Sequence, residues 1–229
     1  MKVLIYGATG MVGRAVLREC LIDPGITAVQ TVGRSATGLS HPKLVELVQS
    51  DLTRYPETIN DLRGYDACFF CLGVSSGDVG EDQYVRLTYD LTTAVARILA
   101  GLNAKMTFVY VSGAGTDSTE SGSVMWARVK GRTENAVLAL FENAYMFRPA
   151  AIEPVHGEIS HTRSYRIAYR VVKPVLPLLR RLFPRFVITS EEIGRAMIRV
   201  ARSGWPTRVL ESIDIRDCAR ASRTSAART

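Results

Sequence analysis

The sequence predicts an α/β fold built on a doubly wound parallel sheet. Short apolar runs rich in strand formers alternate with longer segments whose apolar residues recur at helical spacing, and the connections span a few residues. Such alternation requires right-handed crossovers and a parallel sheet that is covered on both faces. A hydrophobic fraction of 47% over 229 residues is enough for the core of one large domain.

Several expected elements have a local signal. Pro56 suits the first position of a short helix, and Thr189 before Glu191 and Glu192 is a strong helix start. The expected strands lie at residues 3–6, 28–32, 44–48, 67–72, 107–111 and 144–147, and the expected helices at about 12–21, 56–62, 81–99, 124–141 and 189–201. This order fits a Rossmann architecture, whose ligand crevice lies at the carboxyl ends of the strands.

The first fifteen residues carry the clearest functional signal. Gly7, Gly10 and Gly13 follow an apolar strand at three-residue spacing and precede a helix. The first glycine permits a tight turn, the second lets backbone N–H groups approach a pyrophosphate, and the third lets the helix pack on the strand. The helix N-terminus offers free N–H groups to the phosphates. A tight turn that binds nothing is the alternative. The predicted cofactor site also includes Thr9, Met11 and Val12.

The end of the second strand indicates which cofactor binds. An NAD site usually carries Asp or Glu about 20 residues past the glycines, where it bonds the ribose 2′-hydroxyl. This sequence has Arg34 and Ser35 there and no acid. A guanidinium suits a 2′-phosphate because it makes paired charged hydrogen bonds. The sequence therefore favours NADP(H) over NAD(H), with Arg14 as a second candidate for the phosphate; a solvated surface side chain is the alternative for Arg34.

These motifs resemble the extended and atypical short-chain dehydrogenase/reductase superfamily, to which the nucleotide-sugar epimerases and the Tat-interacting reductase-like proteins belong. The resemblance covers about residues 1–205 and is specific at the glycine spacing, Arg34, Ser112-Gly113, Lys130 and Arg148-Pro149. It implies that Asp51 and Leu52 flank the adenine. It also implies that Leu72 and Gly73 run beside the cofactor ribose and that the backbone at Pro149 passes near the nicotinamide. The alternatives are a turn cap for Asp51 and a plain strand-ending glycine for Gly73.

The resemblance also implies a catalytic set, consisting of a Ser or Thr after the fifth strand and then a Tyr and a Lys spaced Y-x-x-x-K. The Tyr exchanges the substrate proton, the Lys holds the nicotinamide ribose, and the Ser polarises the substrate oxygen. Ser112 and Lys130 match by position, but Trp126 stands where the tyrosine is expected. An indole N–H is a donor only and cannot serve as a general acid. Trp126 can still line a pocket, and a core or interface aromatic is the alternative.

Two functions are compatible with this departure. The first is an NADP(H)-dependent oxidoreductase or epimerase that acts on a small carbonyl, alcohol or nucleotide-sugar substrate. The second is a catalytically impaired regulator that senses NADP(H). Tyr84, Tyr89, Tyr165 and His156 are candidates to replace the missing tyrosine, and the sequence does not choose among them.

Cys68 and Cys71 form a C-x-x-C pair inside a predicted strand. Residues three apart on a strand point to opposite faces of the sheet. We therefore expect buried core thiols rather than a redox or metal site.

The remaining expectations concern the organisation and surroundings of the chain. We expect one domain over residues 1–213, with 150–190 as a substrate-covering segment and 214–229 as a disordered tail. Residues 163–185 hold arginines without acids, and we predict two short helices there that cover the crevice; a face for an acidic surface is the alternative. We expect a small-molecule substrate, no nucleic acid, no stable membrane insertion, and a monomer or a dimer. The lack of a signal peptide favours a cytoplasmic location.

Overall fold

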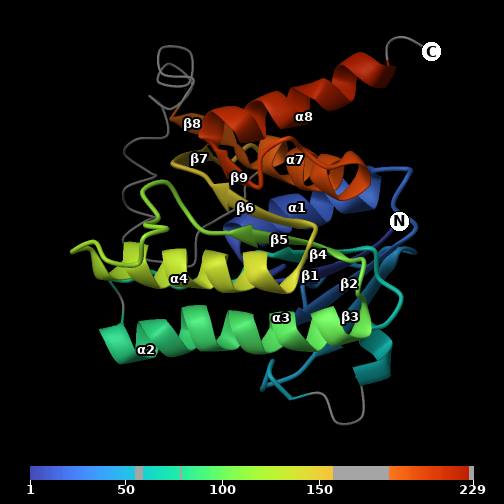
Figure 1. Cartoon of the computed structure of the whole chain (residues 1–229). Helices are drawn as coiled ribbons and strands as arrows, with labels where there is room; N and C mark the ends of the chain where they lie inside the picture. The colour runs from blue at the N-terminus through green and yellow to red at the C-terminus, as the bar shows by residue number, and fades with distance from the viewer. Residues whose placement is uncertain (55–58, 78, 157–185, 227–229) are drawn as a thin grey trace.

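The computed structural model describes residues 1–54, 59–77, 79–156 and 186–226, the last five of these by backbone alone (Figure 1). The strands are β1 (Lys2–Tyr6), β2 (Ala28–Gly33), β3 (Leu44–Val48), β4 (Ala67–Phe70), β5 (Thr107–Val111), β6 (Ala144–Arg148), β7 (Ala151–Glu153), β8 (Val187–Thr189) and β9 (Val209–Glu211). The helices are α1 (Met11–Ile22), α2 (Glu81–Val85), α3 (Leu91–Leu102), α4 (Met125–Leu140), α7 (Ser190–Ser203) and α8 (Ser212–Ala226), with a 3₁₀ segment η1 (Ile59–Leu62) and a π segment η2 (Arg86–Asp90).

The central sheet is parallel throughout and has the strand order β3-β2-β1-β4-β5-β6-β9. The chain runs outward from β1 to β3, returns to β4, and then continues in the opposite direction. The reversal between β1 and β4 is the switch point at which ligands bind in doubly wound sheets, at the carboxyl ends of the strands. The predicted fold class is therefore confirmed, although β9 and the small parallel sheet of β7 and β8 were not predicted.

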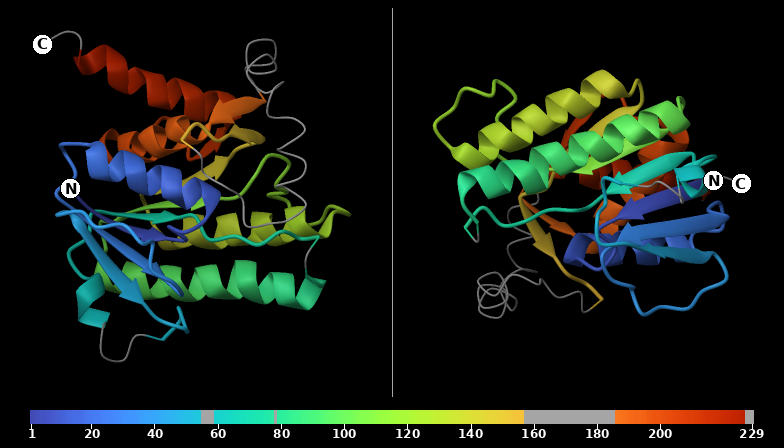
Figure 2. Two further views of the ribbon diagram at one scale, coloured as in Figure 1. Left: turned by 180° about the vertical axis from the view of Figure 1, so that it is seen from behind. Right: turned by 90° about the horizontal axis from the view of Figure 1, so that it is seen from below.

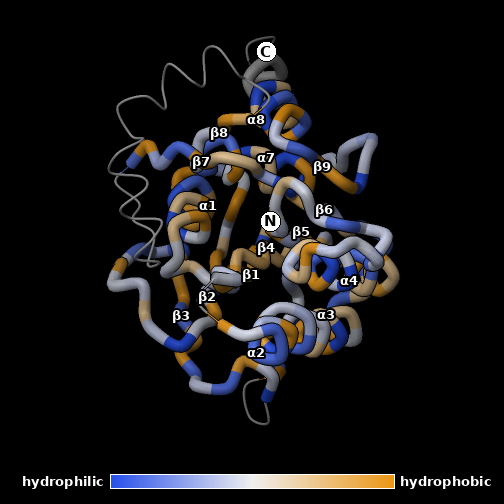
Figure 3. The backbone as a smooth tube through the Cα atoms, turned by 90° about the vertical axis from the view of Figure 1, so that its left-hand side faces the viewer, coloured by the Kyte–Doolittle hydropathy of each residue, from blue (hydrophilic) through white to orange (hydrophobic). Residues whose placement is uncertain are grey.

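Two hydrophobic cores lie on opposite faces of this sheet. Along β1, Val3 and Ile5 belong to the core shared with α1 and α7, whereas Leu4 and Tyr6 belong to the core shared with α3 and α4. Figure 3 shows apolar colouring along the central strands, between the helical layers. Because both faces are covered, β1 reads in the sequence as a continuous apolar run rather than an alternating one.

The helices form one layer on each side of the sheet, with α8 stacked outside α7 (Figure 2). A Cβ atom added to Gly194 of α7 would lie 2.7 Å from Cγ of Glu19, so this glycine permits the close packing of α7 on α1. Buried Glu19 pairs there with Arg195 at 3.2 Å. The predicted start of α7 is confirmed as a capping box, in which Thr189 and Glu192 satisfy each other's backbone N–H groups.

The structure corrects two expectations about the helices. The predicted helix at 81–99 extends to Leu102 and is interrupted by η2, a feature that apolar spacing does not reveal. The predicted disordered tail forms α8 instead. Ile215 and Cys218 are fully buried, and the guanidinium of buried Arg216 donates to the carbonyl of Val187 at 2.5 Å. A narrow apolar stripe at helical spacing is thus enough to dock a segment whose composition is polar.

The prediction for the C-x-x-C pair holds for Cys68, which is buried in β4, whereas Cys71 follows the end of β4 and is only partly buried. Cys68 is buried in the core beside α3 and α4, whereas Cys71 packs against the core beside α1 and α7. Both are free thiols, and burial raises the pKa of Cys71 to about 12. Among the described residues, no cluster of three metal-ligating side chains is present and no helix is long and apolar enough to cross a bilayer.

Candidate functional site

The turn between β1 and α1, residues 7–13, lies at the carboxyl edge of the central sheet. Gly7 has a φ of +80°, and a Cβ atom there would lie 2.8 Å from backbone atoms of Cys71 and Leu72. A Cβ atom on Gly13 would overlap the carbonyl oxygen of Gly7. The N–H of Gly10 donates to that same carbonyl at 3.0 Å and closes the turn. Close backbone approach therefore requires glycine at positions 7 and 13, and we call this segment the glycine turn.

The first turn of α1 is open to an anion. Gly10 is the N-cap and supplies no side-chain acceptor, and the first helical hydrogen bond runs from Arg14 N to Gly10 O. The N–H groups of Met11, Val12 and Gly13 consequently have no acceptor within the helix. The first turn also holds no acidic residue. Free N–H groups at a positive dipole end fit the pyrophosphate of a dinucleotide.

Two arginines stand near this turn. Arg14 folds back across it, and its Nε donates to the carbonyl of Thr9 at 3.1 Å. Arg34 and Ser35 are exposed just past β2, whose Val32 is in register with Tyr6 of β1, so they lie at the same edge as the glycine turn. Within the described residues, Arg34 makes no hydrogen bond or ion pair. Its guanidinium is available to a ligand at this edge.

The other predicted cofactor residues differ in whether they already bond or pack against other parts of the protein. The carboxylate of Asp51 accepts from the N–H and the hydroxyl of Thr53, at 2.9 and 2.6 Å, so it caps a local turn. Leu52 is buried in the core. The backbone N of Leu72 borders Gly7, and Gly73 faces open space. The turn-cap alternative for Asp51 fits this geometry, while its contact with adenine stays a prediction.

The predicted catalytic residues Ser112 and Lys130 lie together where β5 meets α4. Lys130 is partly buried, and its ammonium donates to the carbonyl of Ser112. Burial lowers the pKa of Lys130 to about 8, against an opposing effect of Glu134. The hydroxyl of Ser112 does not face outward: it is buried, donates to the carboxylate of Glu134, and lies 3.2 Å from the carbonyl of Phe147. A role for this hydroxyl on a substrate stays a prediction.

Glu134 is the centre of a network that the sequence analysis missed. It is only 1% exposed and lies one helical turn after Lys130 on α4. Arg148, at the end of β6, holds it through two nitrogens; Nε lies 3.0 Å from Oε1, and Nη2 contacts Oε2. We call Ser112, Lys130, Glu134 and Arg148 the Glu134 cluster. The i, i+4 spacing of Lys130 and Glu134 was the available signal, but that spacing is common on exposed helices.

The loop from β5 to α4 packs against α4 and is hydrogen-bonded to Arg148 of this cluster. A Cβ atom on Gly131 would overlap the carbonyl oxygen of Asp117, so the loop lies directly against the helix. Nη2 of Arg148 donates to the hydroxyl of Ser118 at 2.5 Å. The indole of Trp126 is partly exposed and reaches toward Gly115 of the loop. A Cβ atom on Gly113 would lie 3.8 Å from Nζ of Lys130, so no side chain separates this ammonium from the strand end.

Buried Pro149 follows Arg148 and lies beside this loop. Its carbonyl accepts from the N–H of Ala114 at 3.0 Å. The backbone at Pro149 therefore lies at the carboxyl edge, as its predicted passage near the nicotinamide requires.

The candidates to replace the tyrosine are not brought to one place. Tyr84 of α2 is buried. The ring centroid of Tyr89 lies 3.9 Å from the guanidinium carbon of Arg132. His156 lies 3.6 Å from Glu191 at the start of α7. Tyr165 and the basic stretch 163–185 lie outside the described residues.

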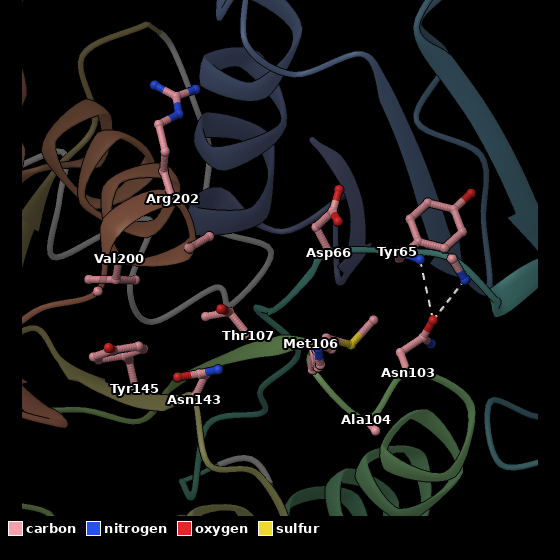
Figure 4. Close-up of a pocket in the computed structure, with 14 residues that line it drawn as sticks. Tyr65, Asp66, Asn103, Ala104, Met106, Thr107, Asn143, Tyr145, Val200 and Arg202 are labelled. Carbon is pink, nitrogen blue, oxygen red and sulfur yellow. Dashed lines mark hydrogen bonds between the residues drawn. The ribbon is translucent and has the colours of Figure 1, made fainter.

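A separate pocket of about 590 Å³ opens at the opposite, amino edge of the sheet (Figure 4). Asp66, Thr107 and Asn143 line it where β4, β5 and β6 begin, and Arg202 of α7 also borders it. Asn103 accepts there from the N–H groups of Gly64 and Tyr65, at 2.8 and 3.3 Å. None of the predicted site residues borders this pocket, so it is distinct from the cofactor site.

The family follows from a match over residues 7–144, more than half of the chain, to the model of a family described as NAD(P)H-binding. The chain belongs to this NAD(P)H-binding family. The matched region begins at the glycine turn and ends at the start of β6. It therefore includes β2 to β5 but not β1, and it covers every predicted cofactor residue except Pro149.

Among curated relatives, "Protein fmp52, mitochondrial" of Emericella nidulans is 29% identical over 159 residues, which is 66% of each chain. "Protein FMP52, mitochondrial" of Debaryomyces hansenii is 26% identical over 209 residues, 88% of each chain. These names contradict the expected cytoplasmic location. That expectation was wrong because a search for a secretory signal does not distinguish among the compartments inside a cell.

Two solved structures, both described with NAD, share the fold of this chain. Bordetella bronchiseptica WbmF in complex with NAD+ has a TM-score of 0.64 at 14% identity, over 96% of this chain and 77% of that one. DesIV, a dTDP-glucose 4,6-dehydratase from Streptomyces venezuelae solved with NAD, has a TM-score of 0.65 at 15% identity, over 98% of this chain and 81% of that one. At these identities the likeness shows a shared fold.

Proposed function

We propose that the protein binds NADP(H) at the glycine turn and is an oxidoreductase or epimerase for a small carbonyl, alcohol or nucleotide-sugar substrate. The observation that carries this proposal is the glycine turn. There, glycine is required at positions 7 and 13, and the first N–H groups of α1 lack helical acceptors. The titles of similar structures, which name NAD, UDP and dTDP-glucose 4,6-dehydratase, support the substrate class.

The preference for the phosphorylated cofactor rests on charge. Arg34 is exposed at the carboxyl edge, has no partner among the described residues, and replaces the acid that would bond a ribose 2′-hydroxyl. A free guanidinium can form paired hydrogen bonds with a 2′-phosphate. Arg14 is less available, because its Nε is held by Thr9.

The residues of the chain would divide the work as follows. The N–H groups of Met11, Val12 and Gly13 hold the pyrophosphate, and Lys130 holds the hydroxyls of the nicotinamide ribose. The bound cofactor supplies hydride transfer. Trp126 cannot supply the substrate proton, since an indole N–H does not titrate near neutral pH. Lys130, with a pKa of about 8, is the group of the Glu134 cluster that can exchange a proton in this range.

Calorimetric titration with NADPH and NADH tests the proposal. We expect NADPH to bind more tightly than NADH. Binding of neither below about 1 mM, which corresponds to only about 4 kcal/mol, would refute the cofactor site. Tighter binding of NADH would refute the role of Arg34 while leaving the site itself in place.

A second candidate is a regulator that binds NADP(H) without hydride transfer. Two observations favour it: Trp126 replaces the proton donor, and the hydroxyl of Ser112 is committed to Glu134. A screen of carbonyl substrates with NADPH, comparing the native protein with Lys130→Ala, separates the two candidates. Turnover that depends on Lys130 excludes the regulator. Activity that appears only after Trp126→Tyr would favour it.

A further inference from the structure

We propose that Glu134 is a positioning residue of the cofactor site, which keeps Lys130 protonated and fixes the strand-end backbone that Lys130 contacts. The inference rests on the proposed NADP(H) site. It concerns a residue that no motif marks, in a cluster at the carboxyl edge of the sheet. Glu134 acts through Lys130, and the groups that Lys130 would bind are the ribose hydroxyls of a dinucleotide.

The geometry makes Glu134 the only shared member of two hydrogen-bond paths within the described residues. In the first path, Lys130 donates to the carbonyl of Ser112, and the hydroxyl of Ser112 donates to Glu134. In the second, Arg148 donates to Glu134 from β6 and also to Ser118 of the loop. Glu134 therefore ties α4 to the ends of β5 and β6 at once.

Because Glu134 is buried, its negative charge acts strongly on neighbouring groups such as Lys130. The side chain of Glu134 is 1% exposed, and that of Arg148 is 11% exposed, so solvent screens this carboxylate poorly. A buried carboxylate is retained only with partners, and here the guanidinium and the serine hydroxyl supply them. Lys130 lies one turn away on the same helix, and without a nearby negative charge its burial would favour the neutral amine.

Other groups near Lys130 are less able to take this role. Glu211 of β9 is 48% exposed and lies 3.6 Å from Arg148, so solvent screens its charge more than that of Glu134. Glu81 of α2 is exposed and pairs with Arg128 at 3.4 Å. Burial raises the pKa of Tyr110, so this side chain is neutral. The elements packed on α4 also carry buried Tyr84 and the Tyr89–Arg132 pair. Their other charged or titratable residues are Asp82, Arg86, Asp90, Arg97 and Tyr145.

The protonation state of Lys130 can be measured directly, because the chain has only five lysines. Protein labelled with ¹³C at the lysine Cε atoms is titrated by NMR from about pH 6 to 11, and Lys130→Met assigns the signal by removing it. We expect a midpoint near 8 in the native protein. In Glu134→Gln the midpoint should fall by about one unit or more, since an opposite charge at close range shifts a pKa by about that much.

The matched control is Glu211→Gln, which removes the other carboxylate on Arg148 and leaves Ser112 and Glu134 intact. Its midpoint should stay within about 0.3 of the native value, well below a one-unit shift. If both variants shift Lys130 equally, or if Glu134→Gln leaves it unchanged, the inference is wrong. Should Glu134→Gln fail to fold, the double variant Glu134→Gln with Arg148→Met removes both buried charges and should still lower the midpoint.

Titration of the same variants with NADPH at pH 7 and at pH 9 completes the test. Affinity should fall more steeply with pH in Glu134→Gln than in Glu211→Gln. If the native protein binds no NADPH, the proposed function fails, while the NMR result still decides whether Glu134 controls Lys130. If NADPH binds and the NMR midpoint does not move, only the inference fails.

Discussion

The glycine turn and the Glu134 cluster lie at the same edge of the sheet, and each contains a helical glycine pressed against a carbonyl. Gly13 of α1 lies against Gly7, and Gly131 of α4 lies against Asp117. Beyond this likeness the two regions differ. The glycine turn offers backbone N–H groups, whereas the cluster consists of side chains that pair with one another.

The difference shows which part of a site tolerates a changed residue. The glycine turn fails if any side chain is added, because the backbone itself makes the contact. The cluster works through the charge and reach of its side chains, so a changed residue beside it, such as Trp126 in place of tyrosine, alters the chemistry there and leaves the fold intact. The pyrophosphate contact and the chemistry beside the cluster can therefore be tested separately.

The largest effects are expected from the two pressed glycines. Gly13→Ala and Gly131→Ala should each lower the free energy of unfolding by about 1–3 kcal/mol, because the new methyl group overlaps a carbonyl oxygen. Only Gly13→Ala should also abolish binding of 2′-phospho-ADP, which carries the pyrophosphate and the 2′-phosphate of NADP but neither the nicotinamide nor its ribose. Urea unfolding and calorimetry measure the two effects.

Gly101→Ala is the matched control, because Gly101 also lies in a helix and a Cβ atom there meets nothing within 4 Å. It should raise the stability by about 0.5–1 kcal/mol, as alanine does in an open helix. Loss of 2′-phospho-ADP binding in Gly131→Ala would contradict the separation between the two regions.

A smaller effect is expected at Arg34, which tests how the proposed cofactor site distinguishes NADPH from NADH. Arg34→Met should weaken NADPH binding about tenfold, or about 1.4 kcal/mol, and leave NADH unchanged, because only the 2′-phosphate is lost as a partner. Arg97→Met, which removes an exposed arginine from α3, is the control. An equal loss of affinity for both cofactors would contradict the role of the guanidinium.

The glycine turn could be predicted from the sequence because its function depends on spacing and on missing side chains, which are visible in the letters. Ser112, Lys130 and Arg148 could likewise be singled out, but Glu134 could not, because it looks like an ordinary charged helix residue until β6 and α4 are packed together. Likewise α8 was missed because Ile215, Cys218 and Ala219 are a small apolar share of a polar segment. Local signals are readable in advance, whereas partners brought together by the fold are not.

The smallest expected effect concerns Asp51, where the turn-cap and adenine roles compete. Hydrogen bonds from Thr53 lower the pKa of Asp51 in the folded state, so its contribution to stability is present above the ordinary pKa of an aspartate and is lost as pH falls through the folded value. Asp51→Ala should therefore be slightly less stable than the native protein at pH 7 and equal to it near pH 2, while Asp51→Asn, which keeps an acceptor for the turn, should fall between them. If adenosine 2′,5′-bisphosphate binds all three proteins equally in a titration at pH 7, the carboxylate serves the turn alone. If the affinity for adenosine 2′,5′-bisphosphate drops in Asp51→Asn while the free energy of unfolding is unchanged, the adenine role is correct. The cofactor site would then use a side-chain contact in addition to the backbone N–H groups of the glycine turn.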